Sequence, residues 1–139
     1  VVLLFIPWLA RKDSRLYYID FLAMLAFGGF YFLWTIPAIQ ATDGMMLGYD
    51  KLFHILGGAC IALFVLCFIG KLSLKRQVVI MLGTVLIVGS MWEVFEWMLG
   101  QLPEPYRQSF NGWKDSSWDL TSDLFGGLII VLWHLLKAR

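Results

Sequence analysis

The chain has 139 residues, of which 60% are hydrophobic and only 15% are charged. Soluble domains carry about 25% charged residues, and a domain this short buries only about two-thirds of its surface by folding. A water-soluble globular domain is therefore excluded, and because the Lys and Arg residues form no basic stripe we expect no nucleic-acid partner. We predict an all-α, polytopic integral membrane bundle of about four transmembrane helices, with the lipid bilayer as its first partner.

The apolar runs follow one another along a single transmembrane domain, 1–139. Residues 1–10 form a partial apolar segment that is too short to cross a bilayer, so we expect either a truncated chain or the remainder of another span. The runs that reach the roughly 20 residues of a spanning helix are 16–41, 51–70, 77–100 and 118–136. The expected loops between them are 42–50, 71–76 and 101–117.

The basic residues give the bundle a direction. With four spans, eight of the eleven Lys and Arg residues fall on one side: Arg11, Lys12, Arg15, Lys71, Lys75, Arg76, Lys137 and Arg139. Loops rich in Lys and Arg remain in the cytoplasm. We therefore expect a cytoplasmic C-terminus, with the segments 42–50 and 101–117 on the outer side.

Ionisable residues lie at or just inside the ends of the last three runs, and inside a span each costs about 2.5–3.5 kcal/mol on insertion scales. They form pairs three or four residues apart, so that each pair shares one helix face: Asp50 and His54, Glu93 and Glu96, Asp119 and Asp123. In the predicted topology the three pairs reach a similar depth in the outer leaflet. Helix capping by Asp50 and Asp119, or a purely structural polar network, is the alternative to a functional site.

A repeated pattern links the second and fourth runs. Asp50-x3-His54-x2-Gly57-Gly58 matches Asp119-x3-Asp123-x2-Gly126-Gly127 in spacing. Glycines allow two helix backbones to approach closely, so we expect these four glycines to lie in helix contacts. The pattern indicates a parallel duplication of helical hairpins, related by an axis along the membrane normal.

The order of these motifs resembles known membrane proteins. Asp50-Lys-x-x-His54, the two glutamates and Asp119-x-x-x-Asp123-x-x-Gly126 resemble the VanZ-like proteins. Trp92-Glu93-x-x-Glu96 and Trp118-Asp119 resemble, more closely, the uncharacterised bacterial inner-membrane family typified by YjdF. The resemblance covers about residues 48–132 and departs from the VanZ-like pattern at Asp123, where those proteins usually carry Asn. It implies a bacterial inner-membrane protein without an assigned activity.

The first functional hypothesis is an enzyme at the outer leaflet that acts on a lipid or lipid-linked envelope precursor. Its candidate catalytic residues are His54, Glu93, Glu96, Asp119 and Asp123. Its candidate ligands for a divalent cation are His54, Glu96, Asp119 and Asp123, because carboxylates suit Mg, Mn or Ca and an imidazole admits Zn. The cation would support hydrolysis or group transfer, whereas a metal-free acid/base pair built on His54 is an alternative. Candidate contacts to a head group are Asp50, Arg107 and Lys114.

Two other functions fit the same sequence. A proton- or cation-coupled transporter would use the carboxylates as ion sites, and four short spans would then require a homo-oligomer. An accessory membrane subunit would need no site at all. Stoichiometric metal in the purified protein would favour the enzyme, and ion flux in liposomes would favour the transporter.

Overall fold

The computed structural model describes residue 36, residues 48–103 and residues 112–138. Within these residues the chain forms three long helices, α4 (Tyr49–Ile69), α5 (Leu74–Gly100) and α6 (Trp113–Lys137), and contains no strand. All three helices are long and apolar enough to cross a membrane. The described part therefore holds three candidate spans instead of the four predicted for the whole chain. The predicted span 16–41 and the segment 1–10 lie outside the described residues.

Two predicted boundaries need correction. The last helix begins at Trp113 and not at residue 118, and the third run is helical from Leu74 and not from residue 77. Both added stretches are polar, so an apolar run does not reveal them, although a polar segment forms helix hydrogen bonds equally well. At Gly112, φ is 93°, a conformation that glycine adopts readily, and the amides of Asp115 and Ser116 bond to its carbonyl.

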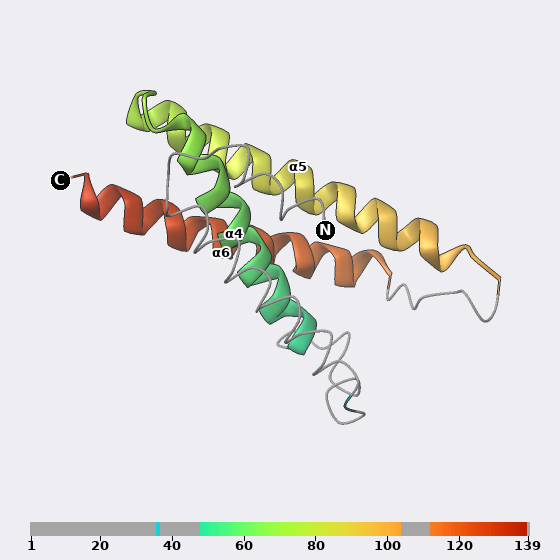
Figure 1. Ribbon diagram of the computed structural model, residues 1–139. Helices are drawn as coiled ribbons and strands as arrows, with labels where there is room; N and C mark the ends of the chain where they lie inside the picture. The colour runs from blue at the N-terminus through green and yellow to red at the C-terminus, as the bar shows by residue number, and fades with distance from the viewer. Residues whose placement is uncertain (1–35, 37–47, 104–111, 139) are drawn as a thin grey trace.

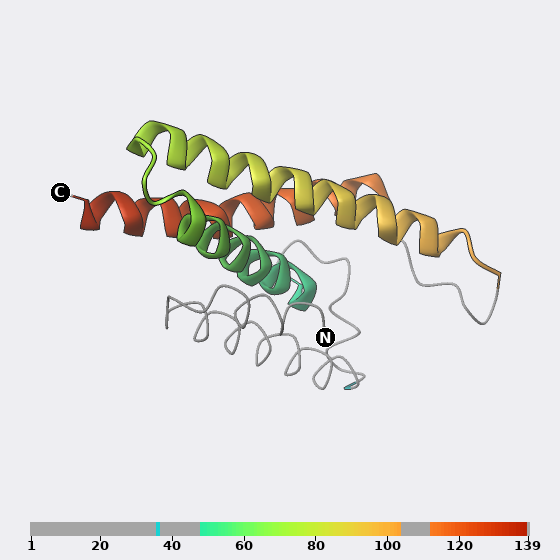
Figure 2. The same ribbon diagram turned by 45° about the horizontal axis from the view of Figure 1, so that its top comes forward.

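The three helices form two kinds of contact. In Figures 1 and 2, α5 and α6 lie side by side in opposite directions, while α4 crosses α6 steeply. The crossing is very close. A Cβ at Gly58 would overlap the backbone of Asp123, and a Cβ at Gly126 would overlap the backbone carbonyl of Ile55. Two of the glycines expected in helix contacts are therefore at the α4–α6 crossing, and Gly127 faces Val85 of α5 instead.

The crossing also defines a register between α4 and α6. Gly58 of α4 packs against the backbone of Asp123, and Gly126 of α6 packs against the backbone of Ile55. The two glycines are 68 positions apart, and so are the two residues that they contact, so positions i and i + 68 play the same part in the crossing. Lys51 and Asp119 are also 68 apart, and they pair with each other. The repeated sequence pattern has an offset of 69, which differs by one residue. The duplication of helical hairpins remains a prediction from the sequence.

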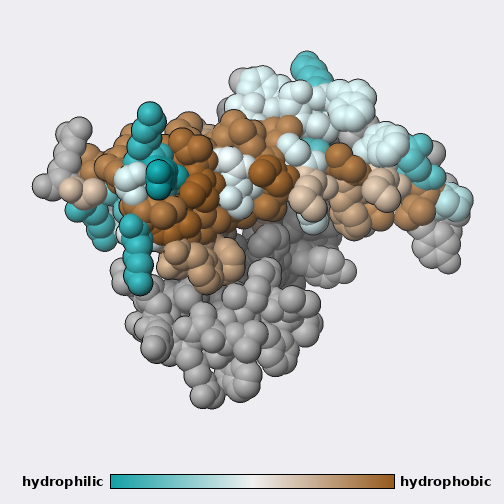
Figure 3. Space-filling view, turned by 90° about the horizontal axis from the view of Figure 1, so that it is seen from above, coloured by the Kyte–Doolittle hydropathy of each residue, from teal (hydrophilic) through white to brown (hydrophobic). Residues whose placement is uncertain are grey.

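The middle of the bundle is apolar. Its buried core consists of Ala62, Met81, Val85 and Val131. On the outward side of α5, large apolar side chains remain exposed, with Val79 and Ile87 at 63% and Met91 at 67%. Figure 3 shows hydrophobic side chains along the middle of one face and hydrophilic ones toward the ends. Apolar surface of this extent is what a lipid environment covers.

At the end of the bundle where α5 begins, one glutamine joins all three helices. The Gln77 Nε2 atom donates to the carbonyl oxygens of Gly70 and Leu72, at 3.1 and 2.8 Å, and so holds the turn between α4 and α5. Its Oε1 atom is 2.5 Å from Nε2 of His134 on α6. These hydrogen bonds give the polar groups of Gln77 and His134 partners within the fold, so we assign them a structural role.

Candidate functional site

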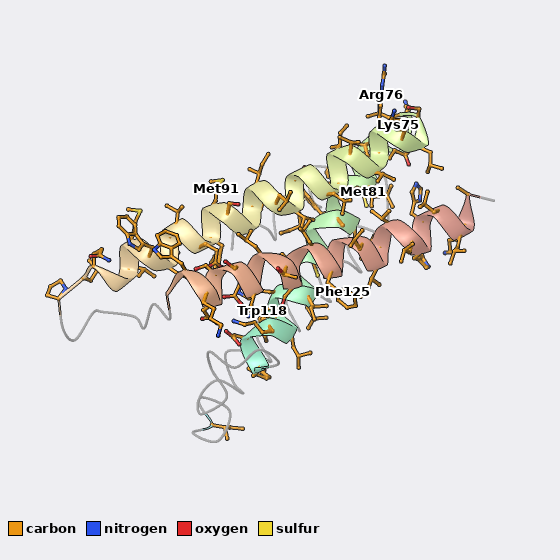
Figure 4. All side chains as sticks on the ribbon, turned by 180° about the vertical axis from the view of Figure 1, so that it is seen from behind. Lys75, Arg76, Met81, Met91, Trp118 and Phe125 are labelled. Carbon is orange, nitrogen blue, oxygen red and sulfur yellow. The ribbon has the colours of Figure 1, made fainter. Side chains whose placement is uncertain are left out.

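The polar cluster lies at the opposite end of the bundle, where α4 and α6 begin and α5 ends. Figure 4 shows side-chain oxygen and nitrogen atoms gathered between α4 and α6 near the labelled Trp118. The cluster residues of α5 and α6 lie on the buried face of each helix. The buried positions of α5 recur every four residues, at Gln77, Met81, Val85, Gly89 and Glu93. On α6 they are Ser116, Asp119, Asp123, Gly126, Gly127 and Val131. On each of these two helices, the same buried face carries the apolar core residues and, farther along, the residues of the polar cluster.

Lys51 is the central cation of the cluster. Its side chain is 3% exposed, and its Nζ atom is 3.0 Å from Asp50 Oδ2 and 2.7 Å from Asp119 Oδ1. Nζ also forms an ion pair and hydrogen bond with Asp115 Oδ1. An ammonium group has three N–H donors. Lys51 Nζ thus donates hydrogen bonds to Asp50 and Asp115 and forms an ion pair with Asp119.

His54 lies between two carboxylates of α6. Its Nε2 atom is 3.4 Å from Asp119 Oδ1, and its Nδ1 atom is 3.3 Å from Asp123 Oδ1. The imidazole is largely buried, with 12% of the side chain exposed. Because both ring nitrogens face acceptors, either Asp119 or Asp123 can hold the ring N–H while the other nitrogen remains available as a ligand.

Asp123 is seated against glycines from both neighbouring helices. A Cβ at Gly89 of α5 would lie 2.5 Å from Asp123 Oδ2, and a Cβ at Gly57 of α4 would lie 3.9 Å from Asp123 Oδ1. Only the missing side chain at Gly89 leaves room for this carboxylate. The position of Asp123 beside His54 therefore depends on glycine at a residue that the sequence analysis does not single out.

Glu93 completes the cluster from α5. It is 5% exposed, and its Oε1 atom is buried and accepts no hydrogen bond from the described residues. Ser116 is a hydrogen-bonding neighbour of its carboxyl group. One ligand atom from each of His54, Glu93 and Asp119 lies within 4.8 Å of the other two. Three helices thus bring one imidazole nitrogen and two carboxylate oxygens together, a donor set that suits Zn or Mn.

A second group of ligand atoms adjoins the first. Atoms of Asp50, Asp115 and Asp119 also lie within 4.8 Å of one another, so Asp119 belongs to both groups. Lys51 contacts all three of these carboxylates.

The cluster as a whole carries an excess of negative charge. Its acidic residues are Asp50, Glu93, Asp115, Asp119 and Asp123. These five carboxylates contribute a formal charge of −5 and Lys51 contributes +1, so the net formal charge of the cluster is −4 while the imidazole is neutral. Buried charge that is not paired is strongly unfavourable. Protons or bound cations must offset this excess.

The structure brings together most, but not all, of the predicted site residues. His54, Glu93, Asp119, Asp123 and Asp50 meet in the cluster. Glu96 belongs to neither group of ligand atoms; it is half-buried and accepts a 2.8 Å hydrogen bond from the Trp92 indole. Lys114 is exposed near the start of α6, and Arg107 lies outside the described residues.

Four residues of the cluster are absent from the sequence-based set. They are Lys51, Gly89, Asp115 and Ser116. The spacing of Asp115, Asp119 and Asp123 is four residues throughout, which would indicate one helix face if the helix were extended to residue 113. No spacing pattern in the sequence indicates that Gly89 belongs to the site.

Polar groups do not continue through the described helices. Asp123 and His134 on α6 are eleven positions apart, about 16 Å of helix, and the buried side chains at this level are the apolar core around Met81 and Val85. In the described residues the cluster is therefore separated from the Gln77–His134 end by apolar packing.

Comparison with known protein families gives a match that covers nearly the whole chain. Residues 4–139 match the family described as predicted membrane protein, DUF2238. No curated protein and no solved structure matches. The match establishes an uncharacterised membrane family, while the relation to VanZ-like or YjdF-type proteins remains a prediction from the motifs. The chain therefore belongs to the DUF2238 family of predicted membrane proteins.

Proposed function

We propose that this protein is a metal-dependent enzyme of the bacterial inner membrane that hydrolyses, or transfers a group from, a lipid or lipid-linked envelope substrate at the outer leaflet. The observation that carries the proposal is the buried Glu93 Oε1 atom, which lacks a hydrogen-bond partner among the described residues and belongs to a carboxylate with an oxygen within 4.8 Å of ligand atoms of His54 and Asp119. A buried acceptor without a donor is costly. A divalent cation would satisfy it.

The donor set supports a catalytic rather than a closed structural metal site. His54, Glu93 and Asp119 supply three ligands, and catalytic zinc sites use three protein ligands with a further position for water or substrate. Asp123 stands at Nδ1 of His54, on the other side of the ring from Asp119. A carboxylate at this place fixes the tautomer of a metal-binding histidine. This ligand set contains Glu93 where the sequence analysis has Glu96.

The chemistry follows from these groups. A bound cation would lower the pKa of water or polarise a phosphoryl or acyl oxygen. Lys114 is exposed at the start of α6, and we propose that it contacts a phosphate head group. Asp50, in contrast, is engaged by Lys51 and is not available to a substrate.

The first test is metal binding by detergent-purified protein. We expect about one Zn²⁺ or Mn²⁺ per chain in the unaltered protein, and loss of that metal in Glu93→Gln and His54→Ala, because each substitution removes a ligand. Glu96→Gln is the matched control, since Glu96 is one turn away on the same helix and outside the ligand group. The metal content of the unaltered protein and of all three variants is measured by elemental analysis, and their metal affinity by calorimetric titration.

Other outcomes would contradict the proposal. Metal retained in Glu93→Gln but lost in Glu96→Gln would refute this ligand set. Protein without metal that conducts protons or cations in liposomes would favour the transporter. For activity, vesicles containing a polyprenyl diphosphate or phosphatidylglycerol are followed for released phosphate and fatty acid, and Glu93→Gln should reduce any metal-dependent release at least 100-fold, on the order of a lost catalytic ligand.

The proposed location on the outer side rests on charge. The end of the bundle opposite the cluster carries Lys71, Lys75, Arg76 and Lys137, and Figure 4 shows Lys75 and Arg76 projecting there. Basic residues near span ends remain in the cytoplasm. The C-terminus is then cytoplasmic, and the motif resemblance to VanZ-like and YjdF-type proteins supports the bacterial inner membrane.

Cysteine labelling in intact cells tests this orientation. In a background with Cys60→Ala and Cys67→Ala, we expect Lys114→Cys to react with a membrane-impermeant maleimide and Lys75→Cys to react only after the cells are opened. Both lysines are exposed, so access to the reagent depends on the side of the membrane. The reverse labelling pattern would place the cluster on the cytoplasmic side.

A further inference from the structure

We propose that the Lys51 ammonium permanently fills a second cation position, so that the site is a mixed centre of one ammonium and one metal ion that share Asp119. The inference rests on the proposed function for the metal ion, and it adds why only one metal would bind. Its basis is the pair of adjoining ligand groups. Asp119 belongs to both, and Lys51 occupies the one formed with Asp50 and Asp115.

The geometry of Lys51 excludes a role in binding substrate anions. Its side chain is 3% exposed, and three carboxylates surround Nζ, as many as the ammonium has donors. A lysine that binds a phosphate needs at least one donor free. The Lys51 ammonium therefore occupies the position in which the surrounding carboxylates would otherwise bind a metal ion.

The shared carboxylate resembles the bridging ligand of two-metal sites, in which the ions lie about 3.5–4 Å apart. Asp119 Oδ1 is 2.7 Å from Lys51 Nζ and 3.4 Å from His54 Nε2, so a cation at the His54 group would lie next to the ammonium. Buried Glu93 Oε1, which lacks a hydrogen-bond donor among the described residues, points to a ligand on the His54 side.

A tethered cation also has a structural consequence. Lys51 belongs to α4, whereas Asp115 and Asp119 belong to α6, so the ammonium joins the two helix ends whether or not metal is present. With Lys51 in place, one divalent ion changes the formal charge of the cluster from −4 to −2 while the imidazole is neutral. Without Lys51, two divalent ions would change it from −5 to −1. The variant without the ammonium should therefore accept a second ion.

The experiment uses Mn²⁺ as the probe on the full chain in detergent. We expect one Mn²⁺ per chain in the unaltered protein and two in Lys51→Met, with a spin-coupled electron paramagnetic resonance signal from two ions that share Asp119. Lys51→Arg keeps a cation and should bind one ion. The double variant Lys51→Met with Asp115→Asn restores the formal charge but removes a ligand, and it should also bind one.

Each result separates this inference from the proposed function. One Mn²⁺ in both the unaltered protein and Lys51→Met overturns the inference and leaves the metal site standing. No Mn²⁺ in the unaltered protein but one in Lys51→Met would show that the ammonium takes the place of a metal ion, and it overturns both the mixed centre and the metal-dependent function. No Mn²⁺ in either overturns both. Lys51→Met that fails to fold in Mn²⁺-supplemented cells, while Lys51→Arg folds, also overturns the inference, because a second metal ion should replace the ammonium.

Discussion

Gly58→Ala and Gly126→Ala are each expected to disrupt the contact between α4 and α6. A Cβ at Gly58 would lie 2.7 Å from the carbonyl carbon of Asp123, and a Cβ at Gly126 would lie 2.8 Å from that of Ile55. The obstructing atoms belong to the backbone, so no rotamer change relieves the overlap and the helices must separate. Overpacking of this kind costs about 1–3 kcal/mol. We expect the upper end of that range for each variant, measured by unfolding in mixed micelles.

Gly83→Ala is the matched control for this prediction. Gly83 lies on α5 and a Cβ there would meet no atom within 4 Å. Its replacement should change stability by less than about 0.5 kcal/mol, as at surface sites free of special contacts. If Gly58→Ala and Gly126→Ala unfold like Gly83→Ala, the close crossing is not the arrangement that the protein adopts.

Gly89→Ala is expected to weaken metal binding although Gly89 is not a ligand. The added Cβ would lie 2.5 Å from Asp123 Oδ2 and would push that carboxylate away from His54 Nδ1. Partners that orient a ligating histidine change metal affinity by about 10–100-fold when they are lost. We expect a decrease of this size for Gly89→Ala and for Asp123→Ala, measured by calorimetric titration with Zn²⁺ or Mn²⁺.

A comparison of variants separates positioning from folding. Asp123→Asn keeps an oxygen that can accept the His54 N–H, so it should bind metal more tightly than Asp123→Ala. Unfolding is measured in parallel, and the metal affinity of Gly83→Ala should remain that of the unaltered protein. Equal affinities for Asp123→Asn and Asp123→Ala, or an unchanged affinity in Gly89→Ala, would show that Asp123 does not orient His54.

Local features of the sequence are enough to predict the class of protein and the approximate extent of the described helices. The runs 51–70, 77–100 and 118–136 correspond to α4, α5 and α6 with differences of at most five residues at their ends. This is possible because a spanning helix needs about 20 apolar residues, a local property. The pairing of ionisable residues also brought His54, Asp119 and Asp123 into one set before any contact was known. The apolar pattern did not predict the first five residues of α6 because four of them are polar.

Which of these residues come into contact depends on how the helices pack. Glu93 and Glu96 are equivalent by spacing, yet Glu93 is buried beside His54 while Glu96 is bound by Trp92, because the side of α5 that faces α6 is set by packing. The burial of Lys51 likewise depends on Asp115 and Asp119, 64 and 68 residues away. Glycine allows the close crossing, but the backbone atoms that face Gly58 and Gly126 fix its register. Long-range packing and charge compensation, which no local pattern encodes, turn the separate acidic motifs into one cluster.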